Sequence, residues 1–224
     1  MPDPPTGVRR ARQLPFWQEA ILLVVTAVLM AVVLKAFLVQ AFYIPSGSME
    51  PTMLVDDKIL VQKVSYWGGD VHRGDVVVFD DPGGWLGPGV TPPGSPVQTA
   101  LSTIGLAPTG GHLIKRVIGT GGDHVMCCAA GRLQVNGVPV DEPYVLDRAA
   151  TAATPFDVTV PAGRLWVMGD NRGNSYASPQ HLDDPDHGFI AESGVVGRAW
   201  VRLWPLGRAG FVRGTSAFDE VPAP

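Results

Sequence analysis

The chain has 224 residues, of which 46% are hydrophobic and 17% charged, and its formal net charge is −4. This apolar content excludes a chain that is disordered throughout, and the negative charge gives no support to nucleic-acid binding, so we expect no nucleic-acid partner. The 27 Gly and 21 Pro residues argue against a helical bundle and favour a mainly β, loop-rich fold.

An apolar segment near the start predicts a membrane helix. Residues 16–39 contain only two charged side chains, Glu19 and Lys35, and a bilayer needs about 20 residues of helix. Residues 1–15 contain three arginines. By the positive-inside rule, this basic tail lies in the cytoplasm and the rest of the chain lies on the extracytoplasmic side of the plasma membrane, after a single pass.

Two alternatives to the anchor stay open. The small residues at Val39-Gln40-Ala41 fit the cleavage site of a secretory signal peptide. The same apolar segment could also form a helix buried in a core.

A serine-rich segment follows directly. Ser46, Gly47 and Ser48 stand between Pro45 and Pro51, and the prolines stiffen the chain on both sides. A rigid loop with a serine and free N–H groups can form a nucleophile with an oxyanion hole. Taken alone, the segment is also consistent with an ordinary turn.

Short β-rich runs bounded by Gly and Asp then predict an extracytoplasmic β domain over residues 40–213. The expected strands are 58–64, 75–79, 112–118, 132–135, 138–140, 164–168 and 197–203. Asn136-Gly137 between two of these strands predicts a two-residue hairpin turn.

Two segments of this region break the pattern. Residues 81–111 are rich in Gly, Pro, Ser and Thr, which predicts a long flexible surface loop. It is either a linker or a contact to substrate or membrane through Trp85 and Leu86. Residues 214–224 are expected to form a disordered tail.

Lys115 is one of only four lysines and lies in a β-branched run. Burial would lower its pKa, so that the amine could serve as a base near neutral pH. Neighbouring strand residues face opposite sides, so we expect one of Lys115 and Arg116 to point inward and the other to point to solvent.

The two cysteines, Cys127 and Cys128, are adjacent. Their number excludes a disulfide framework and a four-cysteine zinc site. Vicinal cysteines bridge each other only with strain, so we expect free thiols.

Polar and turn-forming residues fill segment 167–178, including Asp170, Asn171 and Ser175. They could hold a neighbouring catalytic loop in place or form an ordinary loop. With the serine segment and the lysine strand, they supply a Ser–Lys dyad with an orienting hydroxyl. The histidines show no triad or metal-binding spacing, so we expect no metal and no cofactor.

Five segments, in this order behind an anchor, resemble the bacterial type I signal peptidases, membrane-anchored Ser–Lys endopeptidases. The segments are 45–53 (PSGSMEPTM), 73–79 (RGDVVVF), 115–123 (KRVIGTGGD), 136–144 (NGVPVDEPY) and 169–175 (GDNRGNS). The resemblance implies a β-rich catalytic domain shared with LexA-type self-cleaving repressors. It also implies that the enzyme removes signal peptides from secretory preproteins, cutting after Ala-x-Ala-like sites as a monomer.

The resemblance assigns Ser48 as nucleophile and Lys115 as general base, with Ser175 hydrogen-bonded to that lysine. The backbone N–H of Ser48 and the hydroxyl of Ser46 would form the oxyanion hole. Shallow apolar substrate pockets would be lined by Phe42, Ile44, Met53 and Ile114. Asp170 and Arg172 would support the site, and an apolar surface would rest on lipid of the outer leaflet.

The last of the five segments departs from the family pattern. Gly173, Ala177 and Pro179 stand where many members have two acids and an arginine. We expect an altered loop and an intact dyad. Two alternatives remain: a catalytically silent, membrane-anchored β domain that binds exported proteins, and a self-processing protease of the LexA type.

Overall fold

The computed structural model describes residues 15–66, 69–86, 111–129 and 131–224, without the side chains of residues 33–37 and 129. The chain divides into two compact units, Met1–Lys35 and Ala36–Pro224.

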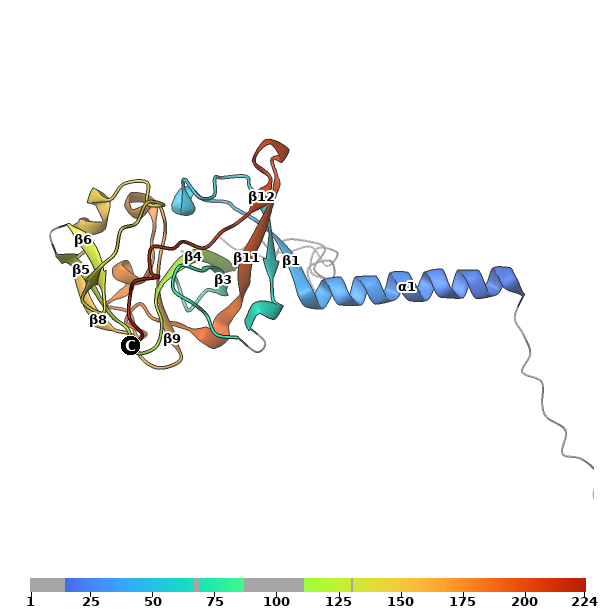
Figure 1. The fold of residues 1–224 in the computed structure, drawn as a ribbon, viewed down its shortest axis with the longest axis horizontal. Coiled ribbons are helices and arrows are strands. Elements are labelled where there is room, and N and C mark those ends of the chain that lie inside the picture. The colour runs from blue at the N-terminus through green and yellow to red at the C-terminus, as the bar shows by residue number, and fades with distance from the viewer. Residues whose placement is uncertain (1–14, 67–68, 87–110, 130) are drawn as a thin grey trace, which may run out of the picture. The chain divides into compact units, whose positions relative to one another are not determined.

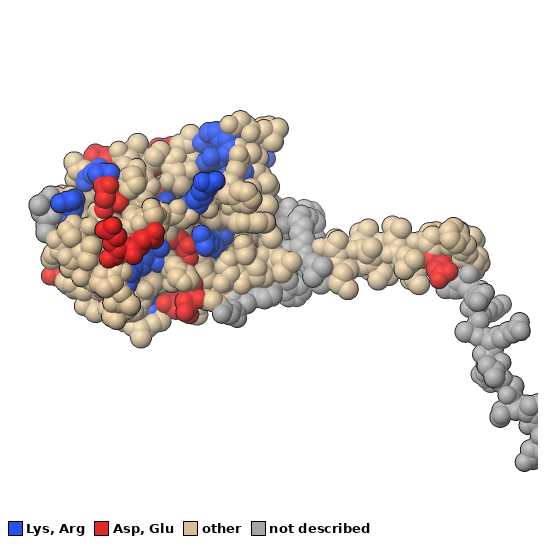
Figure 2. Space-filling view, in the orientation of Figure 1, with Lys and Arg blue, Asp and Glu red and all other residues tan. Residues whose placement is uncertain are grey.

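The first unit contains most of one helix, α1 (Phe16–Leu38), of 23 residues. Its described large apolar side chains are mostly exposed, Leu23 by 67% and Leu29 by 61%. Figure 2 shows a surface almost free of charge, apart from Glu19 near its start. Within the described residues, no helix is both long enough and apolar enough to cross a membrane.

The second unit is mainly β, as expected, and its larger sheet has eight antiparallel strands (Figure 1). Their order is β1 (Val39–Tyr43), β2 (Lys58–Gln62), β11 (Val195–Trp204), β3 (Val76–Asp80), β4 (His112–Gly119), β9 (Arg164–Met168) and β10 (Ile190–Ala191), with β12 (Gly210–Phe211) paired to β11. We call this the first sheet.

The second sheet has four antiparallel strands and lies on the side of the unit away from β1 and β11 (Figure 1). Their order is β7 (Val138–Pro139), β6 (Arg132–Val135), β5 (His124–Ala129) and β8 (Phe156–Thr159). Asn136 and Gly137 connect β6 to β7 with φ angles of 52° and 78°, the left-handed geometry that a two-residue hairpin turn requires. The hairpin prediction is therefore confirmed.

Each predicted strand coincides with an observed strand to within a few residues, but five strands were missed. The missed strands are β1, β5, β8, β10 and β12. In β1, Gln40 and Phe42 are buried and alternate with less buried residues, but this short pattern follows the apolar helix without a break.

Three apolar clusters fill the unit. On β3, Val76 and Val78 belong to one cluster, and Val77 and Phe79 belong to another. Because strand side chains alternate, both faces of the first sheet are covered there. The third cluster joins the second sheet, through Val135 among others, to the first.

The expected disordered tail is wrong. Phe218 and Val221 are 5% and 8% exposed and belong to the third cluster. Arg73 donates hydrogen bonds to the carbonyls of Val221 and Pro222 at 3.1 and 3.0 Å. Two well-spaced apolar side chains and a cation that binds backbone carbonyls are enough to order this segment.

Trp85 is also a core residue, 8% exposed. Its ring stacks on His181 at a centroid distance of 4.3 Å and meets Phe79 edge-on at 6.0 Å. The alternative that Trp85 contacts substrate or membrane is therefore wrong. Most of the expected loop, residues 87–110, lies outside the described residues.

The free-thiol expectation is wrong as well, because Cys127 and Cys128 form a disulfide. They lie where β5 has one residue more than β6 between the pairs Met126–Gln134 and Ala129–Arg132. In a regular strand, adjacent side chains point to opposite faces, and a bulge relaxes that alternation.

Candidate active site

The serine segment forms a loop between β1 and β2 around a short 3-10 helix, η1 (Gly47–Met49). Met49 and Met53 are fully buried in the cluster that also contains Phe42 and Ile44. These two methionines pack the loop onto the first sheet. Ser48 itself is buried, with 6% of its surface exposed. The Ser48 position is thus set by packing on the residues after it.

Segment 167–178 holds the same loop from the other side. The backbone N–H of Asn171 donates to the carbonyl of Ser48 at 3.1 Å, and its side-chain amide donates to the carbonyl of Gly47 at 3.0 Å. The hydroxyl of Ser46 donates to Ser48 Oγ at 3.3 Å. The loop is therefore held by hydrogen bonds to the carbonyls of Gly47 and Ser48 and to Ser48 Oγ.

Lys115 lies on β4, opposite Val77 of β3, and is 3% exposed. Burial lowers the pKa of Lys115 to about 8, and the negative charge of Asp170 opposes part of that shift. An amine with this pKa is partly neutral near pH 7 to 8, so it can accept a proton.

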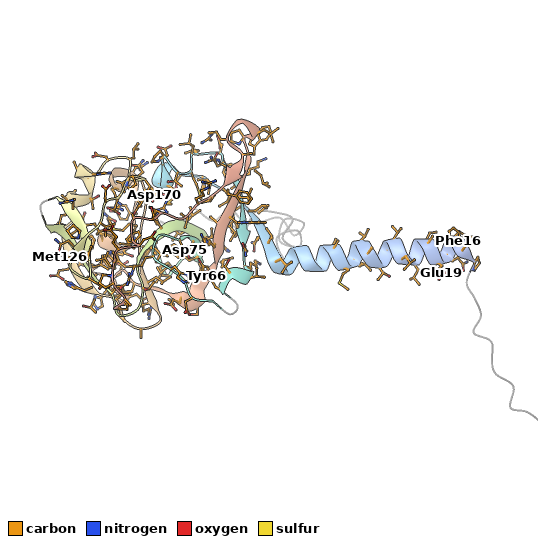
Figure 3. All side chains as sticks on the ribbon, in the orientation of Figure 1. Phe16, Glu19, Tyr66, Asp75, Met126 and Asp170 are labelled. Atoms are coloured by element: carbon orange, nitrogen blue, oxygen red, sulfur yellow. A yellow bond between two sulfur atoms is a disulfide. The ribbon has the colours of Figure 1, made fainter. Side chains whose placement is uncertain are left out.

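Arg116 is buried as well, 2% exposed, so the expectation that one of the two neighbours points to solvent is wrong. The reason is that both faces of the sheet are covered. Arg116 forms a two-pronged ion pair with Asp170, at 2.8 and 2.6 Å, and stacks over the ring of Tyr144 at 4.1 Å. Thr52 of the serine loop donates to Asp170 at 2.5 Å. Figure 3 labels Asp170 within the β unit.

A second buried ion pair supports segment 167–178. Arg172 pairs with Glu142 at 2.5 and 3.1 Å, and both side chains are nearly inaccessible. Arg172 also donates to the carbonyl of Gly169 at 2.9 Å and to Thr151 Oγ1 at 3.0 Å. The structure thus places Asp170 and Arg172 in two ion pairs that Tyr144 links, since its ring lies under Arg116 and its hydroxyl donates to Glu142 at 2.7 Å.

Gly169 lies between Ser48 and Ser175. A Cβ atom there would overlap the Ser175 side chain and the carbonyl oxygen of Ser48, so only glycine fits. Ser175 is 9% exposed, and among the described residues its hydroxyl has no hydrogen-bond partner. A buried hydroxyl without a partner is unusual and points to a use during reaction.

The expected site residues therefore fall in one region of the first sheet. The loop at η1 lies against β4 and against η4 (Arg172–Asn174), which brings the segments of Ser48, Lys115 and Ser175 together. The four expected pocket residues also come together, in one apolar cluster: Phe42, Ile44, Met53 and, partly buried, Ile114.

Sequence reasoning missed the supporting residues Arg116, Glu142, Thr52 and Gly169. All four lie inside segments that resemble the family, namely 45–53, 115–123, 136–144 and 169–175. Their position in these segments was the one sign in the sequence that they matter. Asp170 is 118 and 54 residues from its partners Thr52 and Arg116, and Arg172 is 30 residues from Glu142, which no local pattern reveals.

The altered positions fit their surroundings. A Cβ atom at Gly173 would meet only the Cβ of Ala150, at 3.6 Å, so a side chain could start there without a clash. Ala177 is 2% exposed and Pro179 is buried in η5 (Ser178–His181). Ser178 instead ties this turn to β9, by accepting a hydrogen bond from Val167 N–H at 2.9 Å.

In the part of the chain that the structure describes, no three His, Cys, Asp or Glu side chains are grouped as metal ligands. The chemistry that the region itself offers is a serine hydroxyl, a lysine of lowered pKa and a second buried hydroxyl. This set is suited to attack on a carbonyl carbon.

Comparison with known proteins points to one family of peptidases. The family model described as signal peptidase, peptidase S26, matches residues 17–204. A protein of Mycobacterium tuberculosis (strain CDC 1551 / Oshkosh) named signal peptidase I is 41% identical over 223 residues, covering 88% of this chain and 75% of its own length. A probable signal peptidase I of Mycobacterium leprae (strain TN) is 38% identical, covering 88% and 78%. A probable signal peptidase I-2 of Synechocystis sp. (strain ATCC 27184 / PCC 6803 / Kazusa) is 36% identical, covering 88% and 77%.

Proposed function

The chain belongs to the signal peptidase family, peptidase S26, and from that premise we propose that Ser48 and Lys115 carry out its reaction. It is a hydrolase, a serine peptidase that removes signal peptides. The single observation that carries the assignment of residues is the buried Lys115, whose pKa of about 8 suits a general base.

In the proposed mechanism, neutral Lys115 takes the proton of Ser48 as Oγ attacks the carbonyl carbon of the scissile bond. The Ser48 N–H and the Ser46 hydroxyl donate to the developing oxyanion, which is where such donors act most strongly. Lys115 then gives its proton to the leaving amine. The acyl ester on Ser48 is hydrolysed by a water that Lys115 deprotonates in turn.

Ser175 is proposed as the group that orients the amine of Lys115. Its hydroxyl is buried without a partner among the described residues, and one hydrogen bond from that hydroxyl to the neutral amine would satisfy it. Gly169, which no larger residue can replace, lets Ser175 approach the serine loop. Asp170 and Arg172 act on the site through the networks that hold this segment.

Secretory preproteins are the proposed substrates, cut after small residues of the Ala-x-Ala type. Phe42, Ile44, Met53 and Ile114 share one apolar cluster beside the serine loop. Apolar, tightly packed side chains leave only shallow space, so alanine-sized side chains would fit and larger ones would be excluded.

We propose that residues 16–39, of which the side chains of 33–37 lie outside the described ones, anchor the chain as a single membrane pass. The helix has 23 residues with apolar side chains exposed around it, and residues 1–15 contain three arginines. This polarity puts the N-terminus in the cytoplasm and the β unit at the outer leaflet, in contact with lipid. All the proposed site residues come from one chain, so a monomer suffices.

The test is cleavage of a preprotein by the detergent-solubilised full chain, with the cut site read by mass spectrometry. We expect Ser48→Ala to reduce cleavage by at least about 1,000-fold, with unchanged circular dichroism. Ser193→Ala, at an exposed serine of the same unit, is the matched control and should cleave like the wild type.

Near-wild-type cleavage by Ser48→Ala would contradict the assignment of the nucleophile. Absence of cleavage by the wild type, with signal-peptide binding retained, would instead support the silent binding domain.

A further inference from the structure

The disulfide Cys127–Cys128 stands outside the proposed mechanism and borders a cavity. The cavity measures about 490 Å³ and opens to solvent beside β5 and β8; its lining is mostly apolar. It is lined by Met126, Cys127, Cys128, Pro155, Phe156 and Asp157. Figure 3 shows Met126 at the outer edge of the unit. A small solute can therefore reach the bridge from outside.

The two sulfur-bearing residues differ in exposure. Cys127 is 4% exposed and packs in the third cluster, whereas Cys128 is only partly buried. A nucleophile entering the cavity would reach Cys128 more readily. The buried sulfur of Cys127 is then the leaving group of the exchange.

A continuous set of contacts leads from Cys127 to the candidate active site. Cys127 Sγ lies 3.3 Å from the carbonyl oxygen of Thr151, and Thr151 Oγ1 accepts a hydrogen bond from Arg172 at 3.0 Å. Arg172 Nε donates to the carbonyl of Gly169 at 2.9 Å. Gly169 is in turn packed against Ser175 and Ser48.

We propose that Cys127–Cys128 is a thiol–disulfide exchange site for low-molecular-weight monothiols, and that its reduction lowers the activity of the active site. The inference about activity rests on the proposed function. The inference about exchange rests only on the cavity and on the difference in exposure of the two cysteines.

The chemical step is a two-electron reduction. A thiolate of the monothiol attacks Cys128 Sγ, the Cys127–Cys128 bond breaks, and Cys127 leaves as a thiolate that takes a proton from solvent. A second monothiol attacks the mixed disulfide on Cys128 and leaves with the first as a symmetrical disulfide. The protein gains two thiols, and two monothiols are oxidised.

Reduction changes the contact with Thr151. In the bridge, Cys127 sulfur carries no proton, so the Thr151 carbonyl receives no hydrogen bond from it. After reduction, the thiol can donate to that carbonyl, or the freed side chain can rotate away from it. Either change moves the residue that holds Arg172, and a shift well under 1 Å at a catalytic centre costs a few-fold in rate, since 1 Å costs about 100-fold.

The experiment treats the solubilised full chain with 2-mercaptoethanol, alkylates it with iodoacetamide and locates the adducts by peptide mass spectrometry. We expect a mixed disulfide on Cys128, then two alkylated cysteines, in the folded protein. Preprotein cleavage should fall about three- to tenfold and recover after reoxidation. Hydrogen exchange should become faster in residues 169–175.

The double variant Cys127→Ala/Cys128→Ala is the matched control, and its cleavage rate should not respond to the thiol. A bridge that resists the thiol until the protein unfolds would overturn the exchange site. An opened bridge with unchanged cleavage and unchanged exchange in residues 169–175 would overturn the coupling. If the wild type cleaves nothing even before treatment, the proposed function fails, while adducts and hydrogen exchange still decide this proposal.

Discussion

The first sheet buries charge beside the serine loop, whereas the cluster that joins the second sheet to it is built from apolar side chains. Around Ser48, two ion pairs, Arg116–Asp170 and Arg172–Glu142, are almost inaccessible to solvent. Under the second sheet, Val135 and Phe156 pack in an apolar cluster with Leu133 and Trp166. Both regions are buried, one around paired charges and the other around apolar side chains.

The difference separates the residues that stabilise this fold from those that prepare it for chemistry. Apolar burial contributes roughly 25 cal/mol per Å², whereas a buried ion pair barely offsets its desolvation. A buried lysine with lowered pKa is a net cost to folding. Apolar burial in the three clusters thus offsets the cost of holding Lys115 and its neighbours inside the unit.

Replacing Lys115 sharpens this contrast most. We expect Lys115→Met to lose at least about 1,000-fold in cleavage rate while gaining roughly 2–3 kcal/mol of stability at pH 7, because methionine fills the space without a charge. Cleavage assays and thermal unfolding measure the two effects. Lys58→Met, at an exposed lysine of β2, should change neither, and a loss of stability in Lys115→Met would refute the contrast.

An apolar deletion under the second sheet should do the opposite. Val135 is fully buried, so Val135→Ala is expected to cost about 2 kcal/mol of stability through lost burial and a cavity. Cleavage per folded molecule should stay within about twofold. Urea unfolding and steady-state kinetics at a temperature where the variant is folded give both values. A large fall in kcat would show that the regions are not separable.

A smaller effect is expected where segment 167–178 holds the serine loop. Asn171→Ala removes the hydrogen bond to the Gly47 carbonyl, worth about 0.5–1.5 kcal/mol, so kcat should fall by up to about tenfold with little change in KM. The nearby exposed Asn174 provides the control, since Asn174→Ala should behave like the wild type. Equal kinetics of the two variants would remove Asn171 from the positioning residues.

The hairpin of the second sheet can be predicted from the sequence, whereas the surroundings of Lys115 cannot. Asn136-Gly137 encodes its turn locally, because only a few residue types adopt positive φ at both positions. Lys115 and Arg116 follow a different logic. Strand alternation predicts opposite faces correctly, but whether both faces are covered depends on segments far along the chain.

The predictions of a disordered tail and of free cysteines are wrong for the same physical reason: both features depend on tertiary structure. Phe218 and Val221 are isolated apolar residues in a polar segment of the sequence. They become core residues only through packing against residues far away along the chain. Cys127 and Cys128 form a disulfide at a bulge of β5. No Gly, Pro or Asn near these cysteines in β5 indicates the bulge in the sequence. Order along the chain identified the candidate site segments, whereas the ion pairs between them come from tertiary structure.

The central claim, a general base whose amine is made available by burial, is tested most directly by the pH dependence of kcat/KM for preprotein cleavage. Since burial lowers the pKa of Lys115 from 10.5 to about 8, the protonated and inactive form dominates below that value. We predict that kcat/KM rises about tenfold per pH unit from pH 6, with a midpoint near pH 8, and then levels off. The account would be contradicted by a profile that is flat from pH 6 to 9, or one that still rises toward the pKa of an exposed lysine.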